Sequence, residues 1–587
     1  TSLDEALQKL TPSFSSMTNG MGTTLSLNGL PDDYFIFLEN GKRLYGDDTY
    51  ARINVAKIKR IEILNGASSA LYGTNAIGGV INIITDDAKN AINVSSDTRY
   101  ASKGRFTQSV NIDVNTGKFG SYTSYRRQQA EGWQLNPYEE NSKTHELEET
   151  GKVASTGFYA NTVNQKFTFD ATDKLSFYAR GGYYDNKTRR PYEAYDYNIL
   201  HETFNYGIGA QYMINKGNYI TADCYADHFS SSYCFFKDNK TYNGKAGEEQ
   251  VRKRTRNHNL SIKGIFKLGN RHKLSVGTEY IVDVLKSQTD NIAKEDAYTL
   301  ALFAQDEIKL LRNLQALIGV RYIYHENFKN HATPNVALMY KPGKFNFRAS
   351  YAAGFRTPTL SELYATDIAK KNDRLTIGNL DLKPEKNNYF SLSAEYVHER
   401  FSVSVNAFYN NIRDMIDYNT IATGDKAMEQ YGHKEVRQRD NIAEAKVHGI
   451  NVSANAYLGA GFNLSGGYTH LNTQDVELEQ PIDKSIKNAY NINAQWAHSW
   501  KIYRLNINLN GRINSKRFSK SYGYAPEYQL WDLNTRHSFN LKSVIIEPGF
   551  GMENLFDYMD DRPYNSNYAT LTPGRSFYIS LSLKFKS

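Results

Sequence analysis

The chain ends on the stretch Phe577-Tyr578-Ile579-Ser580-Leu581-Ser582-Leu583-Lys584-Phe585, in which apolar residues recur at every second position. The same period of two occurs at Phe390–Tyr396 and at Phe401–Tyr409. Because successive side chains of a β-strand point to opposite faces, each stretch predicts a strand with one apolar and one polar face. From Ala91 onward this pattern continues almost everywhere and predicts an all-β architecture.

The connections between these strands alternate in length. Ten tight turns are expected, at residues 115–118, 171–174, 215–218, 269–272, 311–313, 341–344, 398–400, 458–461, 499–501 and 540–543. The long polar connections between them include residues 129–150, 185–203, 230–254, 355–387, 413–440, 472–486 and 554–574. Ten short turns opposite eleven connections predict 22 strands. Short turns at one end and long loops at the other are typical of an outer-membrane β-barrel.

The composition is compatible with such a barrel and excludes several other classes. The chain has 587 residues, with a net charge of +8 and 13% aromatic residues, of which 44 are Tyr. Its mean hydropathy is −0.60. No run approaches the ~20 apolar residues that a membrane helix needs, but barrel strands dilute the hydropathy signal with lumen-facing polar residues. No basic block with interleaved aromatic residues indicates nucleic-acid binding.

Two parts of the chain differ in pattern. Residues 1–89 are Gly-rich and open on Ser2 and Glu5, which predict the capped start of a short helix. Residues 90–587 carry the period of two and are predicted to form a 22-stranded antiparallel transmembrane β-barrel. A soluble propeller or sandwich array is the alternative, but the repeat of ~40–50 residues with blade signatures that a propeller shows is not found.

A second informative stretch reads Lys59-Arg60-Ile61-Glu62-Ile63-Leu64-Asn65-Gly66-Ala67-Ser68-Ser69-Ala70-Leu71-Tyr72-Gly73-Thr74-Asn75-Ala76-Ile77-Gly78-Gly79-Val80-Ile81-Asn82-Ile83-Ile84-Thr85. It resembles the plug-domain signature of TonB-dependent outer-membrane transporters. Upstream, Leu25–Leu30 and Phe35–Leu44 look like the preceding plug strands. Near the C-terminus, Asn554-Leu555-Phe556 and Pro573-Gly574-Arg575 are similar to the segments before the family's last strand.

This resemblance implies an organisation and partners. Residues 1–89 would be an N-terminal plug domain inside the lumen of the barrel formed by residues 90–587. The plug is expected to be truncated at its start and to lack the family's energy-coupling box. The implied location is the bacterial outer membrane, in contact with its lipid. The implied partners are a TonB-type energy-transducing complex and a metal-chelate ligand.

Catalysis is not expected. Four His-Glu pairs occur, but none continues to the His-Glu-x-x-His pattern of a zinc hydrolase, and no phosphate-binding Gly-rich loop is found. We therefore predict no catalytic residues, no bound metal and no required cofactor. Cys224 and Cys234 are too few for a disulfide framework, which leaves one bridge or two free thiols.

The transported ligand is predicted from the connection at residues 355–387. Phe355-Arg356-Thr357-Pro358 and residues 378–385 are similar to paired boxes of heme-type receptors, and related boxes occur in cobalamin and siderophore receptors. Cobalamin or heme is the leading expectation, and a ferric siderophore is the alternative. Heme iron requires a ligand such as His or Tyr. Candidate ligands are Tyr45, Tyr50, Tyr364, His201 and His433, although the His residues also suit ordinary solvated loop positions.

The predicted ligand site lies above the plug, where Tyr rings of the outer loops would stack on the ligand. Plug loops 17–24 and 45–50 are expected to form its floor, with Arg356 and Tyr364 on its wall. Arg356 is equally suited to a lumen salt bridge between barrel and plug. The predicted floor residues are Asn19, Thr23, Tyr45, Asp47, Asp48 and Tyr50.

Two other classes of function stay open. A passive channel for small solutes would conduct ions in a planar bilayer. A surface-adhesion or scaffold protein would bind another protein through its loops, and a surface lipoprotein is a possible partner in either transport or adhesion.

Overall fold

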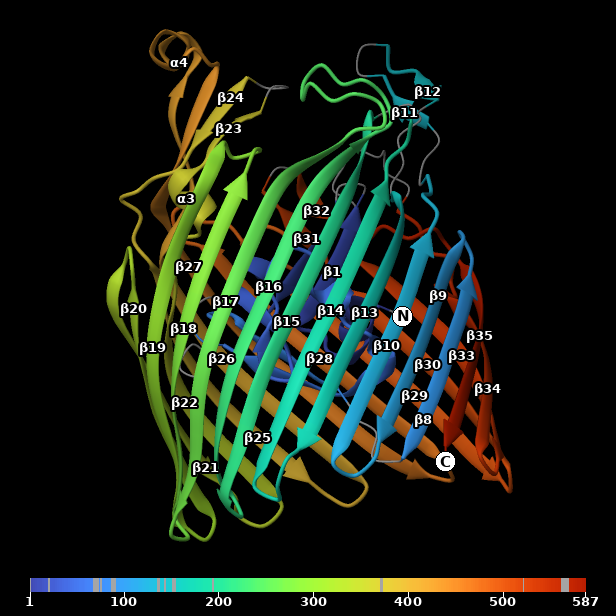
Figure 1. Cartoon of the computed structure of the whole chain (residues 1–587). Coiled ribbons are helices and arrows are strands. Elements are labelled where there is room, and N and C mark those ends of the chain that lie inside the picture. Colours follow the sequence, from blue (N-terminus) through green and yellow to red (C-terminus); the bar gives the residue numbers. More distant parts are fainter. Residues whose placement is uncertain are drawn as a thin grey trace.

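A computed structural model describes residues 2–19, 22–66, 73, 76–85, 91–134, 138–141, 144–149, 155–192, 195–369, 373–520, 522–560 and 569–586. The chain forms a closed barrel around a smaller N-terminal domain (Figure 1). Among the helices that the structure describes, none combines the length and apolar content required of a membrane-spanning helix.

The barrel wall has 22 strands, and each pairs antiparallel with the next wall strand along the chain. The last strand pairs with the first, from Tyr578 opposite Ala101 to Lys586 opposite Asn93, which closes the sheet. The wall strands are β8 (Ile92–Ala101), β9 (Arg105–Asn115), β10 (Phe119–Ala130), β13 (Gly157–Asp170), β14 (Leu175–Arg189), β15 (Tyr197–Asn215), β16 (Asn218–Phe235), β17 (Glu249–Leu268), β18 (His272–Ser287), β19 (Ile292–Leu311), β20 (Leu314–His325), β21 (Lys329–Tyr340), β22 (Phe345–Arg356), β25 (Glu385–Val397), β26 (Phe401–Thr423), β27 (Glu435–Gly459), β28 (Phe462–Asp475), β29 (Asn488–Trp500), β30 (Tyr503–Asn514), β33 (Tyr528–Leu541), β34 (Val544–Glu553) and β35 (Ser576–Lys586).

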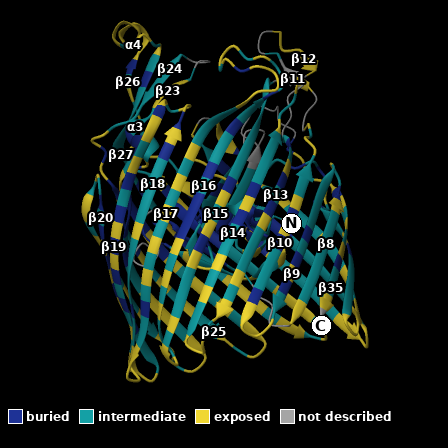
Figure 2. Ribbon diagram, viewed as in Figure 1, coloured by how far each residue is buried: buried dark blue, intermediate teal, exposed yellow. Residues whose placement is uncertain are grey.

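Apolar side chains on the wall point outward. Leu392, Ile208 and Phe550 are 65%, 63% and 53% exposed, although they lie within strands. Figure 2 shows exposed residues alternating with less exposed ones along the wall. In a soluble β-sandwich these side chains would be buried between two sheets. The outward apolar face therefore fits a lipid environment, as the alternation predicts.

The expected division into short turns and long loops is confirmed. All ten connections at one end have two to four residues, whereas most connections at the other end are longer. This long-loop end is at the top of Figure 1. Its loops contain the elements β11 (Tyr138–Glu140), β12 (Leu147–Glu149), α3 (Leu360–Tyr364), β23 (Thr366–Ala369), β24 (Arg374–Ile377), α4 (Gly424–Tyr431), β31 (Arg517–Ser519) and β32 (Gly523–Ala525).

Three connections expected as loops are partly strand. β14 to β17 run well into residues 185–203 and 230–254, and β26 and β27 extend to 23 and 25 residues. Their ends carry α4, while β24 pairs parallel with β27. A strand that rises above the membrane meets water on both faces and loses the apolar alternation. The sequence pattern therefore underestimated these strands.

The N-terminal domain consists of two small sheets and a helix. Its first sheet has the order β1-β2-β3 and its second the order β5-β4-β7-β6. The Ser2–Glu5 capping box at the first helix is confirmed. The elements are α1 (Leu3–Leu10), β1 (Phe14–Asn19), β2 (Gly22–Leu27), β3 (Leu30–Pro31), η1 (Asp32–Tyr34), β4 (Phe35–Glu39), β5 (Lys42–Arg43), η2 (Thr49–Arg52), η3 (Val55–Lys57), β6 (Ile58–Asn65) and β7 (Gly79–Thr85). Of the signature stretch 59–85, residues 67–72, 74 and 75 lie outside the described residues.

Two apolar cores hold this domain in place. One is internal and includes Leu7, Phe14 and Ile81. The other joins Leu30, Tyr34 and Ile77 of the N-terminal domain to wall residues that include Phe408 and Val447. The domain is thus packed directly against the inner face of the barrel and forms a plug.

Candidate ligand-binding site

The plug loop 45–50 lies against the wall near the long-loop end. It connects β5 to η2, and its contacts are with His201 near the start of β15 and Lys253 near the start of β17. Both strands begin at the long-loop end. The structure thus places this predicted floor segment where a ligand entering between the long loops would meet the plug.

Asp48 anchors the loop to the wall. Its Oδ2 atom lies 2.7 Å from Nδ1 of His201 and accepts a hydrogen bond of 3.4 Å from Asn186 Nδ2. Burial alone would raise the pKa of Asp48, but the contacts with His201 and Asn186, together with the nearby Arg52, hold it below its ordinary value. His201 therefore already has a carboxylate partner and is not a free iron ligand.

Asp47 is the acidic residue of the loop that is open to solvent. Its carboxylate lies 3.5 Å from Lys253 Nζ, and the two side chains are 51% and 34% exposed. This pair can exchange its weak mutual contact for contacts to a ligand. The two residues are the best placed of the loop and its wall partners to meet a charged group.

Tyr45 lies beside a buried ion pair. Arg52 donates from Nη1 to both carboxylate oxygens of Asp227, at 3.1 and 2.9 Å, and from Nη2 to the Tyr45 carbonyl. The Tyr45 backbone N–H donates to the same Asp227 carboxylate at 3.0 Å. Burial raises the pKa of the Tyr45 phenol above its ordinary value, which disfavours the phenolate form that would bind iron. Tyr45 therefore holds loop 45–50 to the wall through its backbone.

Tyr50 and Thr23 are brought together, as the prediction of a shared floor requires. Their side chains are hydrogen-bonded, and burial raises the pKa of the Tyr50 phenol. Thr23 belongs to the β1–β2 hairpin, in which the backbone of Asn19 pairs with that of Gly22. Residues 20 and 21 of the predicted loop 17–24 lie outside the described residues.

Arg356 occupies a buried ion cluster. Its guanidinium donates two 3.0 Å hydrogen bonds to Glu362 and also contacts Glu385. Tyr34 of the plug donates to Glu385 at 3.3 Å. Arg356 is 3% exposed. The geometry favours the salt bridge between barrel and plug over a ligand contact, because a buried guanidinium requires its carboxylate partners.

The other predicted residues lie in the long loops. Tyr364 ends α3 and packs beside the buried side chains of Leu363 and Leu382. His433 lies 2.9 Å from Asp373 beside α4. Cys224 and Cys234 are free thiols. Across the part of the chain that the structure describes, no group of three potential metal-ligating side chains occurs.

The sequence analysis missed the charged residues that hold loop 45–50 and Arg356 in place. Arg52, Asp227, Glu362 and Glu385 are charged residues with no local motif. The alternation does place Asp227 and Glu385 on the lumen face of their strands, which is a usable signal. Their partners could not be found, because Arg52 and Asp227 are separated by 175 positions.

Comparison with known families now identifies the architecture. Residues 1–80 match the TonB-dependent receptor plug domain, and residues 103–555 match the TonB-dependent receptor-like β-barrel. The chain belongs to the TonB-dependent receptor family. The receptor is therefore an outer-membrane transport protein and not an enzyme. The family implies a TonB partner and a chelate ligand. The long-loop end is extracellular and the short-turn end periplasmic.

Solved structures resemble the receptor over its whole length. A mutant of the ferric enterobactin receptor PfeA from Pseudomonas aeruginosa has a TM-score of 0.84 at 16% identity, covering 100% of this chain and 96% of that one. The siderophore receptor PirA from Acinetobacter baumannii has a TM-score of 0.81 at 16% identity, with coverage of 100% and 96%. The FrpB iron transporter from Neisseria meningitidis has a TM-score of 0.77 at 13% identity, with coverage of 100% and 97%.

Proposed function

We propose that the receptor imports a ferric siderophore across the outer membrane with energy supplied through TonB. The observation that carries this proposal is the whole-chain similarity to the enterobactin receptor PfeA and the siderophore receptor PirA. It favours the alternative ligand of the sequence analysis over cobalamin or heme.

The chemistry of the plug surface argues further against heme. His201 is paired with Asp48, and burial disfavours the phenolates of Tyr45 and Tyr50. A siderophore arrives with its iron already coordinated, so it needs no protein ligand to the metal. It needs hydrogen bonds, charge complementarity and aromatic contacts, which polar and Tyr-rich extracellular loops supply.

The proposed site is the floor formed by plug loop 45–50 together with the β1–β2 hairpin. Asp47 and its wall partner Lys253 would contact the ligand. Asp48, Tyr45 and Tyr50 would hold the loop in position. Asn19 and Thr23 belong to the same floor through the hairpin, and Tyr364 would approach from the loop above.

Ligand binding to the purified receptor in detergent tests this proposal. Quenching of intrinsic fluorescence would be measured with ferric enterobactin, ferrichrome, ferric citrate, cyanocobalamin and heme. We expect saturable binding of a ferric siderophore, and a change of at least about twofold in its affinity for Lys253→Gln, as for one exposed charge contact. Lys118→Gln, in a periplasmic turn, is the matched control and should bind like the wild type. Saturable binding of heme or cobalamin without any siderophore would overturn the proposal.

The other predicted classes can be tested separately. A passive channel would conduct in a planar bilayer, whereas a lumen filled by the plug should give no steady conductance. The surface lipoprotein stays a prediction, and co-purification of a lipid-modified partner would support it.

A further inference from the structure

A large cavity lies on the periplasmic side of the plug, away from the proposed ligand floor. Its volume is about 950 Å³, and strand β6 of the plug borders it through Ile63, Leu64 and Asn65. The rest of its lining comes from lumen-facing residues of β17 to β26 and from the periplasmic turn at Gly269–Arg271. Small-molecule sites occupy about 300–1,000 Å³, so this cavity is large enough for a metal chelate.

The cavity is strongly basic. Of the lining residues that the structure describes, five are cationic and only Glu307 is acidic. Lys273 pairs with Glu307 at 2.9 Å. Within the described part of the chain, the other four cations have no carboxylate partner. The cationic residues are Lys267, Arg271, Lys273, Lys309 and Arg348.

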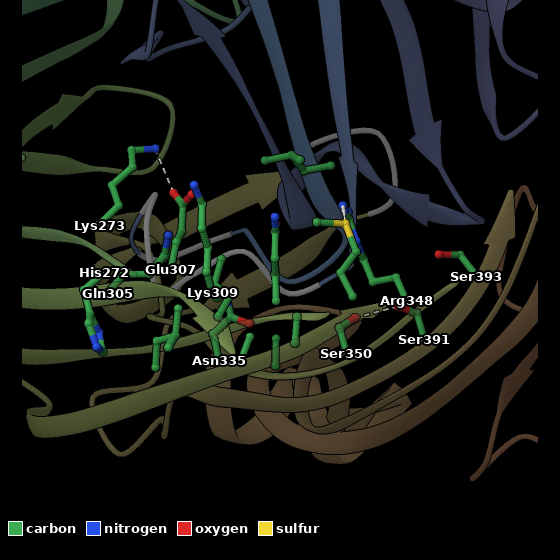
Figure 3. A pocket seen from close by; sticks show the side chains of 18 of the residues that line it. His272, Lys273, Gln305, Glu307, Lys309, Asn335, Arg348, Ser350, Ser391 and Ser393 are labelled. Atoms are coloured by element: carbon green, nitrogen blue, oxygen red, sulfur yellow. Dashed lines mark hydrogen bonds and ion pairs between the residues drawn. The ribbon is translucent and has the colours of Figure 1, made fainter. Parts of the chain in front are cut away.

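These charges converge on one space. Figure 3 shows Lys273, Glu307 and Lys309 extending from neighbouring strands on one side, with Arg348 on the other. Lys309 and Arg348 are exposed to this space and point away from the lipid, because they occupy lumen-facing positions of β19 and β22. Cations on the low-dielectric walls of a water-filled space attract multivalent anions.

The cavity is closed toward the extracellular side by the plug. The ring of Tyr389, which lines it, packs so closely on Gly66 that no Cβ atom fits there, and Gly66 has a φ of +81°. Gly66 follows directly after the plug strand β6, which ends at Asn65.

We propose that this cavity is an anion-binding exit site, which takes a multivalent anionic chelate after it has passed the plug. This inference rests on the proposed import function. It assigns to Lys309, Arg348 and Lys267 a role in drawing the chelate to the periplasmic mouth. A free periplasmic anion such as pyrophosphate has the same chemistry and is distinguished in the test.

The test uses the purified full-length receptor and probes of defined charge. Isothermal titration would compare the dianionic gadolinium–DTPA complex, a neutral gadolinium macrocycle of similar size, and pyrophosphate. We expect saturable binding of gadolinium–DTPA and none of the neutral complex. The double variant Lys309→Gln with Arg348→Gln should weaken binding about fivefold or more, as for the loss of two exposed charge contacts. Lys118→Gln with Lys174→Gln, two turn lysines at the same end but outside the cavity, should have no effect.

Three results would overturn the exit site. They are no binding of the dianion, equal binding of the neutral complex, or binding that the double variant leaves unchanged. Tighter binding of pyrophosphate than of the chelate, lost in the same variant, would overturn the assignment to a chelate. A receptor that binds a siderophore but fails these tests would retain the proposed import function and lose only the exit site.

Discussion

Single polar residues of the wall hold the plug by its backbone. Arg512 on β30 donates to the carbonyl oxygens of Gln8, Thr11, Pro12 and Phe14 at 3.0 to 3.2 Å. A carbonyl can accept from a charged donor without carrying a charge of its own, so the contact is strong but needs no matching acidic residue. Gln8, Thr11 and Pro12 lie outside the sheets of the plug, so these bonds give a charged donor to carbonyl groups that no sheet pairs.

Replacing Arg512 by Ala should loosen the start of the plug. Four carbonyl groups would lose a charged donor, and we expect the opening free energy of α1 and β1 to fall by about 2–3 kcal/mol. Hydrogen exchange of their backbone amides measures this change. Arg504→Ala is the matched control, because Arg504 lies on the same strand but is exposed. Unchanged exchange in the Arg512 variant would contradict the anchoring role.

The contact between Asp48 and His201 should stabilise loop 45–50 in a pH-dependent way. The folded-state pKa of Asp48 lies below its ordinary 3.8. The contact with Asp48 also raises the pKa of His201 above its ordinary 6.5, against the lowering effect of burial. The stabilisation is therefore fully present between about pH 4 and pH 6.5, and it is lost as the pH falls through the lowered pKa of Asp48 or rises through the raised pKa of His201. A double-mutant cycle with Asp48→Asn and His201→Gln should give a coupling of about 1 kcal/mol at neutral pH, read from hydrogen exchange of the loop. A coupling near zero at neutral pH would show that the contact does not stabilise the loop.

At the scale of elements, β26 and β27 build a projection above the wall. A separate small core of Ala422, Ala427 and Val436 lies beneath α4. This core is separate from the two cores that involve the plug. We therefore expect the projection to unfold independently of the barrel.

Ala427→Asp should unfold the tip of the projection. Ala427 is fully buried, and an unpaired carboxylate there costs at least about 3 kcal/mol. Trypsin should then cut at Lys426 or Lys434, while the barrel stays intact on a gel. The neighbouring Met428 is 44% exposed, so Met428→Asp should remain resistant. Cleavage of both variants alike would contradict the assigned core.

At the scale of the whole molecule, one sheet separates lipid from an aqueous, plug-filled lumen. Neighbouring residues on a strand therefore face different surroundings, lipid on the outer face and the aqueous lumen on the inner face. Leu392, near the middle of β25, is 65% exposed on the outer face, whereas Ser393 lines the periplasmic cavity.

Arginine should be tolerated on one side of this sheet and not on the other. Leu392→Arg places a charge in the hydrocarbon and should cost about 2–4 kcal/mol, whereas Ser393→Arg should cost little. The folded fraction after insertion into lipid vesicles, followed by the faster gel migration of unheated barrels, measures the difference. If both variants folded equally well, the assignment of the outer face to the lipid would be wrong.

The barrel and the plug follow from the sequence alone, for local physical reasons. A strand between lipid and water must alternate, and ten tight turns restrict how those strands connect, so periodicity and turn residues suffice for a 22-stranded wall. The strands above the membrane escaped detection because both of their faces meet water. The plug signature, by contrast, is a local run of residues.

The arrangement of the site was decided by the tertiary structure. The sequence places Asp47, Asp48 and Arg356 in segments that can face a ligand, but it does not say which of them is already paired. Folding brings His201 to Asp48, and Glu385 to Arg356, across long stretches of chain. The basic cavity is likewise lined by cationic side chains that come from several different strands. Charge pairing depends on distance in space, and only closure of the barrel around the plug sets those distances.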